Sequence, residues 1–209
     1  MIVDPSSLPE RESYRLMISA FVPRPIAFVS TRSLAGVDNC APFSFSMGVS
    51  SRPMVLAISV GERDDRPKDT ARNIFDTREF VVNLVTEAIS EKMNVASGDY
   101  ADDVSEFAES GLTPAPSEAV RAPRVAESPV NFECRLIRAV AVADNTVFFG
   151  QAVRLRVEEA VMTDGLVDVL KAKPIGRLGG PRYSRTKDVF EMPRPKITGP
   201  KAAKRTEAR

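Results

Sequence analysis

The stretch that decides the fold runs from Val130 to Glu159 and reads VNFECRLIRAVAVADNTVFFGQAVRLRVEE. Two runs in it alternate between apolar and polar residues. The apolar residues that share one face of the first run are Val130, Phe132, Cys134 and Leu136. Those of the second run are Val153, Leu155 and Val157. A period of two is typical of strands with one buried and one solvent-facing side. Residues 144–145 between the runs predict a tight turn, so the stretch predicts an antiparallel hairpin.

Further strands are predicted upstream of this hairpin. The runs 24–31, 53–61 and 79–86 are short, apolar and rich in β-branched or aromatic residues. Helical patterns are fewer, and they cover 9–20, 68–77 and 87–97. The segment 109–129 holds four prolines and predicts a long surface connection. Many strands with few helices predict a mainly β fold, an antiparallel β-barrel with peripheral helices that is closed or nearly closed.

Length and composition indicate one domain. The chain has 209 residues, of which 43% are hydrophobic, and its net charge is +1. We expect a single domain over residues 1–192 and a basic, flexible tail over 193–209. No apolar run approaches the roughly 20 residues that span a bilayer, and the N-terminus lacks the pattern of a signal peptide. A cytoplasmic protein without membrane or nucleic-acid partners is therefore expected. The basic residues of the tail have no aromatic residues between them, so the tail gives little support for nucleic-acid binding. These residues are Arg194, Lys196, Lys201, Lys204, Arg205 and Arg209.

The absence of histidine narrows the chemistry. The chain contains no His and only two cysteines, Cys40 and Cys134, which lie far apart in the sequence. A Ser-His-Asp triad, a Cys-His pair and a His-ligated zinc site are excluded. No metal site and no catalytic side chain can be named. If the protein is an enzyme, a cofactor is the better candidate for the difficult step.

The segment RPKDTARNI, residues 66–74, could bind an anion. A helix that begins near Asp69 exposes N–H groups and a positive dipole end, to which Arg66, Lys68 and Thr70 add donors. Asp69 would repel a phosphate, unless it caps the helix or holds Lys68 and Arg66. The alternative is that Asp69 is an ordinary N-cap and the cations are solvated, and N-caps are far commoner than anion sites. These residues alone leave both interpretations open.

Two further segments could line a ligand. In GVDNCAPFSFSMGVSSRP, residues 36–53, small and hydroxylated residues would let a flat molecule approach the backbone. Pro42 cannot donate to a sheet, so we expect the strand to be interrupted there. The alternative is a serine-rich edge strand. In PIGRLGGPRYSR, residues 174–185, Arg177 and Tyr183 could cover an aromatic ligand or brace a subunit interface. The chain contains neither a dinucleotide-binding nor a P-loop motif.

Taken in order, these segments resemble the flavin reductase-like family with the FMN-binding split-barrel fold. The similar stretches include PRPIAFVST (23–31), RPKDTARNI (66–74), REFVVNLV (78–85) and PIGRLGG (174–180), and the resemblance covers roughly residues 10 to 190. It implies a homodimer of six- or seven-stranded antiparallel barrels of Greek-key type, with FMN near the dimer interface. It also implies an oxidoreductase that passes a hydride from NADH or NADPH to flavin, with a second flavin or a partner oxygenase as the acceptor.

The resemblance also implies the positions of the flavin site. Next to the ring it places Ser30, Thr31, Asn39, Cys40, Ala41 and Pro42. At the phosphate it places Ser44, Arg66, Lys68 and Thr70. Arg177 and Tyr183 would close over the site, from the same subunit or from the second one. Members of this family often carry a histidine at the hairpin turn, where this chain has Asn145. That departure keeps open a flavoenzyme acting on another small molecule and a non-catalytic FMN-binding protein.

Overall fold

The hairpin of residues 130–157 forms the longest pair of strands in the computed structural model of the chain, which describes residues 1–64 and 66–195. Strand β10 (Val130–Val142) pairs antiparallel with β11 (Asn145–Val157), which confirms the predicted hairpin. The tight turn lies one residue earlier than predicted, at Ala143 and Asp144, because Asn145 already pairs with Val142. Ala143 accommodates this turn with a φ of 50°.

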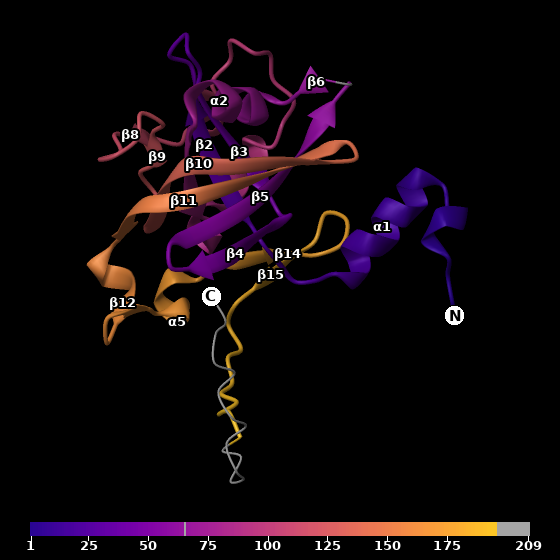
Figure 1. Cartoon of the computed structure of the whole chain (residues 1–209). Coiled ribbons are helices and arrows are strands. Elements are labelled where there is room, and N and C mark those ends of the chain that lie inside the picture. The colour runs from indigo at the N-terminus through magenta and orange to yellow at the C-terminus, as the bar shows by residue number, and fades with distance from the viewer. Residues whose placement is uncertain (65, 196–209) are drawn as a thin grey trace, which may run out of the picture.

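The main sheet closes on itself as a barrel (Figure 1). Its order is β3-β2-β7-β10-β11-β5-β4, with β6 paired to β5, and every pairing is antiparallel. The two strands that end this order, β3 and β4, are separated along the chain only by Ser44 and Phe45. One continuous segment therefore pairs with both edges and completes the ring. The remaining main-sheet strands are β2 (Ala27–Arg32), β3 (Asp38–Phe43), β4 (Ser46–Ser51), β5 (Met54–Arg63), β6 (Arg66–Pro67) and β7 (Glu79–Leu84).

Pro42 does not interrupt its strand, contrary to the prediction. It lies inside β3 opposite Phe28, and the chain leaves the strand only after Phe43. Strand β3 borders a single neighbour in the sheet, β2, so the missing N–H of Pro42 removes no required bond on its other side.

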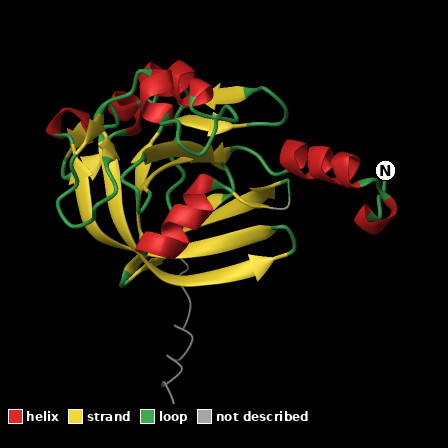
Figure 2. Ribbon diagram, turned by 90° about the horizontal axis from the view of Figure 1, so that it is seen from above, coloured by secondary structure: helices red, strands yellow, loops and turns green. Residues whose placement is uncertain are grey.

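Smaller sheets and helices surround the barrel (Figure 2). The short strands are β1 (Arg24–Pro25), β8 (Pro114–Ala115), β9 (Arg124–Val125), β12 (Met162–Thr163), β13 (Leu166–Val167), β14 (Ile175–Arg177) and β15 (Tyr183–Arg185). The α-helices are α1 (Glu10–Ala20), α2 (Asp69–Thr77), α3 (Ser90–Val95), α4 (Glu106–Ser110) and α5 (Val169–Ala172). Single 3₁₀ turns are η1 (Pro5–Ser7), η2 (Glu87–Ile89) and η3 (Glu159–Val161). The predicted helices at 9–20, 68–77 and 87–97 are confirmed.

The core has two main parts on either side of the barrel wall. One fills the barrel, where Phe80, Cys134 and Phe148 are fully buried and Ile74 enters from α2. The other lies outside the wall, where Phe28 packs with residues of α3 and α4. Because β2 is buried on both sides, its first three residues, Ala27, Phe28 and Val29, are all apolar and do not alternate with polar ones.

The first two polar residues of β10 do not face solvent, contrary to the prediction from its alternation, whereas Arg135 is exposed as predicted. Asn131 is fully buried and Glu133 is 2% exposed. The proline-rich connection covers them, and the Glu133 carboxylate accepts the backbone N–H groups of Glu118 at 2.9 Å and Ala119 at 2.6 Å. That connection begins at the end of α4 and includes β8 and β9, so it is a packed cover and not only a surface loop.

Helix α1 extends sideways from the barrel (Figures 1 and 2). Its only buried residue is Ile18, whereas Tyr14, Leu16 and Met17 are 52%, 40% and 48% exposed. Among the described residues, the longest helix is too short and too polar to cross a membrane. Of the predicted tail, residues 193–195 are exposed, and 196–209 lie outside the described part of the chain.

Candidate functional site

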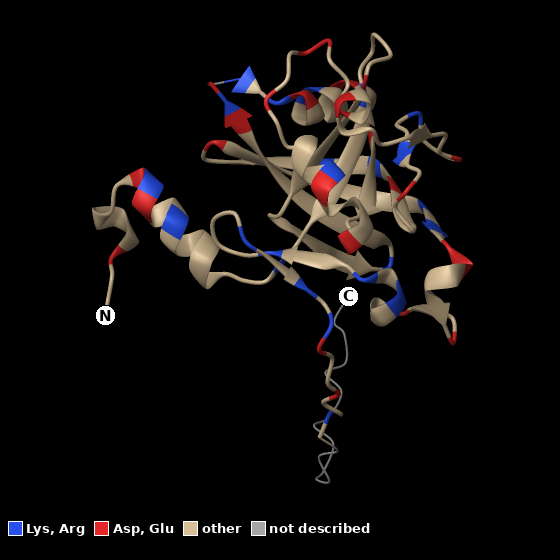
Figure 3. Cartoon of the chain, turned by 180° about the vertical axis from the view of Figure 1, so that it is seen from behind, with Lys and Arg blue, Asp and Glu red and all other residues tan. Residues whose placement is uncertain are grey.

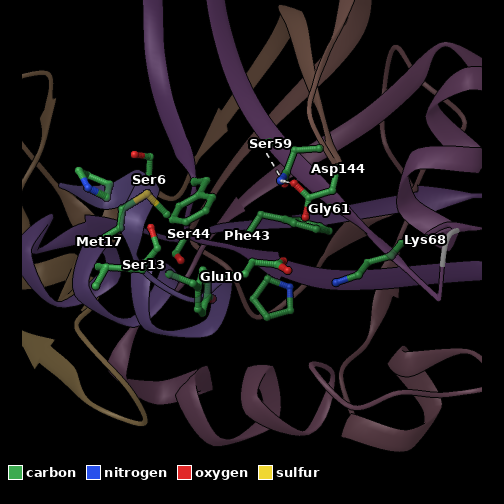
Figure 4. A pocket seen from close by; sticks show the side chains of 16 residues that line it. Ser6, Glu10, Ser13, Met17, Phe43, Ser44, Ser59, Gly61, Lys68 and Asp144 are labelled. Atoms are coloured by element: carbon green, nitrogen blue, oxygen red, sulfur yellow. Dashed lines mark hydrogen bonds between the residues drawn. The ribbon is translucent and has the colours of Figure 1, made fainter.

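Three adjoining cavities form a groove along β3, and Pro42 lines all of them. We call this the Pro42 groove. Its main cavity, of about 680 Å³, lies between the N-terminal segment and strands β3 and β5. Side cavities of about 210 and 80 Å³ open from it. Figure 4 shows Phe43 and Ser44 between Met17 on one side and Lys68 on the other. A main cavity of this size is within the range of small-molecule sites, about 300–1,000 Å³.

The start of α2 faces one end of the groove. Lys68 is the N-cap residue, and no described side chain accepts the first N–H groups of the helix. The Asp69 carboxylate pairs with Arg72 three residues later. Asp69 therefore neither caps the helix nor holds Lys68 or Arg66, and both predicted roles of Asp69 are wrong. Because Arg72 offsets the Asp69 charge, Lys68 and the free N–H groups remain suited to an anion.

A buried hydrogen-bond network fixes the helix against β3. The Thr70 hydroxyl, 1% exposed, donates to Asn39 Oδ1 at 3.0 Å, and the Thr31 hydroxyl donates to the same oxygen at 3.3 Å. Asn73 Nδ2 donates to Thr31 Oγ1 at 3.0 Å. The Thr70 hydroxyl thus donates its one hydrogen bond to Asn39. This geometry does not support the predicted donation of that hydroxyl to a phosphate.

A carboxylate that the sequence did not single out completes this network. Glu106 of α4 is 6% exposed and accepts from Asn39 Nδ2 at 2.8 Å and from the Cys40 N–H at 3.2 Å. Burial raises the pKa of the Glu106 carboxyl, although these donors and the backbone N–H of Glu106 itself act in the opposite direction. Sequence alone offered no signal for it, because its partners lie 67 and 66 residues away.

Three of the predicted ring contacts lie behind the groove wall. Ser30, Thr31 and Cys40 are fully buried and line none of the three cavities. The Ser30 hydroxyl donates to the Pro123 carbonyl and accepts from Asn83. Burial, reinforced by nearby carboxylates, raises the pKa of the Cys40 thiol, so it stays protonated and is no nucleophile. These three residues support the groove wall from the protein interior and do not line the groove.

The other predicted residues, with one exception, meet at the groove. Those that line at least one of its cavities are Asn39, Ala41, Pro42, Ser44, Lys68, Thr70, Arg177 and Tyr183. Arg66 is exposed on β6 and lines none of them, so the structure does not place it with the rest. Segments from residues 39 to 183 are thus brought together, which the sequence order alone could not show.

The side cavity of about 210 Å³ is built around two arginines. Arg24 is 3% exposed, and Arg177 stacks on the Tyr183 ring with 4.6 Å between the guanidinium carbon and the ring centroid. Arg177 Nη1 also donates to the Tyr183 hydroxyl. Arg24 was not among the predicted residues, although it lies in the stretch PRPIAFVST that carries the family resemblance.

Asn145, at the position where the family resemblance implies a histidine, lies at the groove. It lines the main cavity, its Oδ1 accepts from the Ser59 hydroxyl at 3.4 Å, and its Nδ2 donates to Asp144 at 2.9 Å. An amide can hydrogen-bond to a ligand but cannot titrate near neutral pH as histidine does.

The comparison with protein families agrees with this geometry. The family model of the flavin reductase like domain matches residues 18–171. The chain belongs to this family. The predictions of a mainly β split barrel and of a flavin reductase-like oxidoreductase are therefore confirmed.

Solved structures resemble the chain over most of its length. Nitrilotriacetate monooxygenase component B from Bacillus cereus is 31% identical, with a TM-score of 0.88 and coverage of 92% of this chain and 98% of that one. The 2-nitrobenzoate 2-nitroreductase NbaA of Pseudomonas fluorescens is 30% identical, with a TM-score of 0.87 and coverage of 97% and 100%. A protein of Shewanella frigidimarina, described as a flavin reductase with a split barrel domain, shares the fold at 24% identity, a TM-score of 0.81 and coverage of 91% and 96%.

Proposed function

We propose that this flavin reductase-like protein binds FMN in the Pro42 groove and reduces it with NADH or NADPH. A second flavin or a partner oxygenase then receives the electrons. The observation that carries the proposal is the composition of the groove. It has a cation and free helix N–H groups at one end and a wall of small and apolar residues beside them.

The cationic end of the groove suits a phosphate. The Lys68 amine lies at the uncapped start of α2, and it makes no ion pair with any described residue. Phosphates bind readily to such helix starts, where backbone donors and the helix dipole act together. In this arrangement Lys68 and the first N–H groups of α2 would hold the phosphate, and Thr70 would keep the helix start in position through Asn39.

The wall suits a flat ring. Ala41, Pro42 and Phe43 follow each other along β3 and line the groove, and Ser44, Ser59 and Asn145 add polar groups around its main cavity. Bound flavin supplies the hydride and electron transfer, for which this histidine-free chain has no side chain of its own. The chain's own groups would bind and orient the cofactor and limit the access of water.

Replacing Lys68 tests the phosphate end. Charged hydrogen bonds contribute about 1.5–3 kcal/mol, so Lys68→Met should weaken FMN binding about 10- to 100-fold. Riboflavin, which lacks the phosphate, should bind both proteins equally. Arg66→Met is the matched control, because Arg66 is exposed and outside the groove. Dissociation constants from flavin fluorescence decide the outcome. Equal FMN affinity in Lys68→Met would place the phosphate elsewhere.

Turnover tests the reductase itself. The purified protein should be yellow, and it should oxidise NADH or NADPH when flavin is added. A yellow protein that oxidises neither would leave flavin binding in place and reject the reductase proposal.

A second candidate function is the reduction of another small molecule on the same cofactor. Two observations favour it: Asn145 in place of a titratable group at the groove, and the likeness to a nitroreductase. Anaerobic screening of small molecules against the reduced protein, followed by the return of the oxidised flavin spectrum, separates the two candidates. If no molecule from the screen reoxidises the flavin and no nicotinamide reduces it, the chain is a flavin-binding protein without catalysis.

We also propose a homodimer. Apolar residues are exposed along α1 and on the outer face of β4, β10 and β11, where a cavity of about 480 Å³ lies around Ile137. Exposed apolar patches of this kind mark protein–protein contacts. The likeness to component B of a monooxygenase supports an oxygenase as a further partner.

A further inference from the structure

Two arginines face each other across a strand pair beside the groove. Strands β1 and β14 pair so that Arg24 and Arg177 are direct cross-strand partners. Both line the side cavity of about 210 Å³, and no described carboxylate lines it. Like charges directly opposite each other destabilise a strand pair. An anion between the two guanidinium groups would therefore stabilise the arrangement. We call this cavity the paired-arginine pocket.

Arg24 is buried without a charged partner. It donates to Ser44 Oγ at 3.3 Å and to the carbonyls of Ile18 at 2.7 Å, Phe21 at 3.0 Å and Leu178 at 3.2 Å. All four acceptors are neutral, and none of the ion pairs of the described chain includes Arg24. These bonds use four of the five guanidinium N–H groups, so one at Nη2 remains free.

Burial lowers the pKa of Arg24, and the neighbouring Arg177 lowers it further, whereas Tyr14 raises it. A buried cation beside a second cation is unfavourable unless an anion compensates both.

The opposite side of the pocket is held rigidly. A Cβ on Gly176 would lie 2.8 Å from Ser184 Oγ and 3.2 Å from Pro23 Cβ, so β14 lies tightly against its neighbours. The Arg177 guanidinium is stacked on Tyr183 and donates to its hydroxyl, whose own proton remains free to donate. Basic positions recur along β14, β15 and the adjoining loop in Figure 3. The pocket thus offers fixed donors from two elements.

We propose that the paired-arginine pocket binds the carboxylate or phosphate group of the small molecule that reacts beside the flavin. This inference rests on the proposed function, because Lys68 and α2 on the other side of Pro42 already account for the flavin's own phosphate. Ile18, Ile26 and Met93 also line the pocket, so it accepts an apolar body next to the anionic group.

The size and position of the pocket fit one end of a ligand. Its volume is below the range of about 300–1,000 Å³ for complete ligand sites. It shares Tyr14, Pro42 and Ser44 with the main cavity, so a ligand anchored at the arginines extends toward the proposed ring position. Arginine suits carboxylates and phosphates because its planar fork donates two parallel hydrogen bonds.

Titration with simple anions tests the pocket. The FMN-loaded protein and the flavin-free protein are titrated with benzoate and with inorganic phosphate by calorimetry. Arg177→Met should weaken benzoate or phosphate binding at least 10-fold, and Arg177→Lys, which keeps the charge, should weaken it less. Tyr183→Phe removes one donor and should weaken it about 3- to 10-fold. Arg182→Met, an exposed arginine of the same loop, is the matched control and should bind as the wild type does.

Thermal unfolding gives a readout that does not depend on flavin. Phosphate or benzoate should raise the melting temperature of the wild type and of Arg182→Met, and it should raise that of Arg177→Met much less. Without anions, Arg177→Met loses its contacts with Tyr183 as well as the repulsion from Arg24, so the shift caused by anions is measured from each protein's own anion-free melting temperature.

Each other result has a separate meaning. Equal anion binding by Arg177→Met and the wild type would overturn the inference. Weaker binding of FMN, but not of riboflavin, in Arg177→Met would show that the pocket holds the flavin's phosphate, which overturns it as well. If the wild type binds no FMN but its anion binding still depends on Arg177, the proposed function fails and the anion site stands.

Discussion

At the scale of single residues, the buried Glu106 carboxyl group behind the groove wall makes the stability of the fold depend on pH. It is 6% exposed, and burial raises its pKa above the ordinary value of 4.5. The folded chain then binds this proton more tightly than the unfolded chain. The contribution of Glu106 to stability is therefore fully present below pH 4.5 and is lost as the pH rises through the raised pKa.

The variant Glu106→Gln should remove this pH dependence. The amide stays neutral at every pH, so the stability advantage of the wild type over the variant should shrink as the pH rises from about 5 to 8. Urea unfolding at a series of pH values measures it. Glu109→Gln, at an exposed position of the same helix, controls for the loss of one negative charge. An advantage that grows with pH would show that the protein stabilises the ionised form.

Single residues also show how far the sequence could lead. The family resemblance placed Lys68 and Pro42 at the flavin site, local composition left the role of Lys68 open, and both residues line the groove. The partners of Asp69 and Thr70 were not predictable. A carboxylate at a helix start can cap, pair forward or pair backward, and only the folded chain decides between them. Arg24 was missed because an arginine next to a proline-bounded strand gives no sign of burial in the sequence.

At the scale of elements, Gly150 lets β11 pass over the aromatic core of the barrel. A Cβ at this position would overlap the Phe80 ring and lie 3.0 Å from Cys134 Cβ. Gly150→Ala should therefore destabilise the fold by about 1–3 kcal/mol, the usual effect of overpacking a core. Urea unfolding measures the change.

The matched control is Gly48→Ala on β4, where nothing lies within 4 Å of the added Cβ. Its effect should stay within about 0.5 kcal/mol. Equal stability of the two variants would mean that Phe80 moves aside without loss of packing.

The elements also explain where pattern-based prediction stopped. Alternation in residues 130–136 correctly indicated a strand, but it assigned the polar side to solvent. Its first two polar residues are buried under the proline-rich connection: Asn131 Nδ2 donates to the Val125 carbonyl at 3.3 Å, and the Glu133 carboxylate accepts the Glu118 N–H at 2.9 Å. Prolines marked that connection as irregular, which it largely is. Irregular backbone can still be buried when buried side chains supply its hydrogen bonds.

At the scale of the whole molecule, the unpaired apolar surfaces suggest what the single chain lacks. Helix α1 borders the main cavity through Tyr14 and Met17, yet these side chains are about half exposed. A helix with an exposed apolar face is weakly stabilised by its own chain. A second copy that covers α1 and the face around Ile137 would remove this apolar area from water and close the open side of the groove.

The last prediction concerns that assembly. The wild type should have twice the mass of one chain, which is 22.8 kDa, in light scattering after gel filtration. Ile137 is 50% exposed and lines the outer cavity together with Val49 and Val140. A charge there would have to be buried on association, so Ile137→Glu should produce monomers and weaken FMN binding at least several-fold.

Leu34→Glu, at the 72% exposed position between β2 and β3, should leave the mass and the affinity unchanged. A monomeric wild type would reject the homodimer. If Ile137→Glu is still a dimer, the interface does not include this part of β10, and α1 is the remaining candidate.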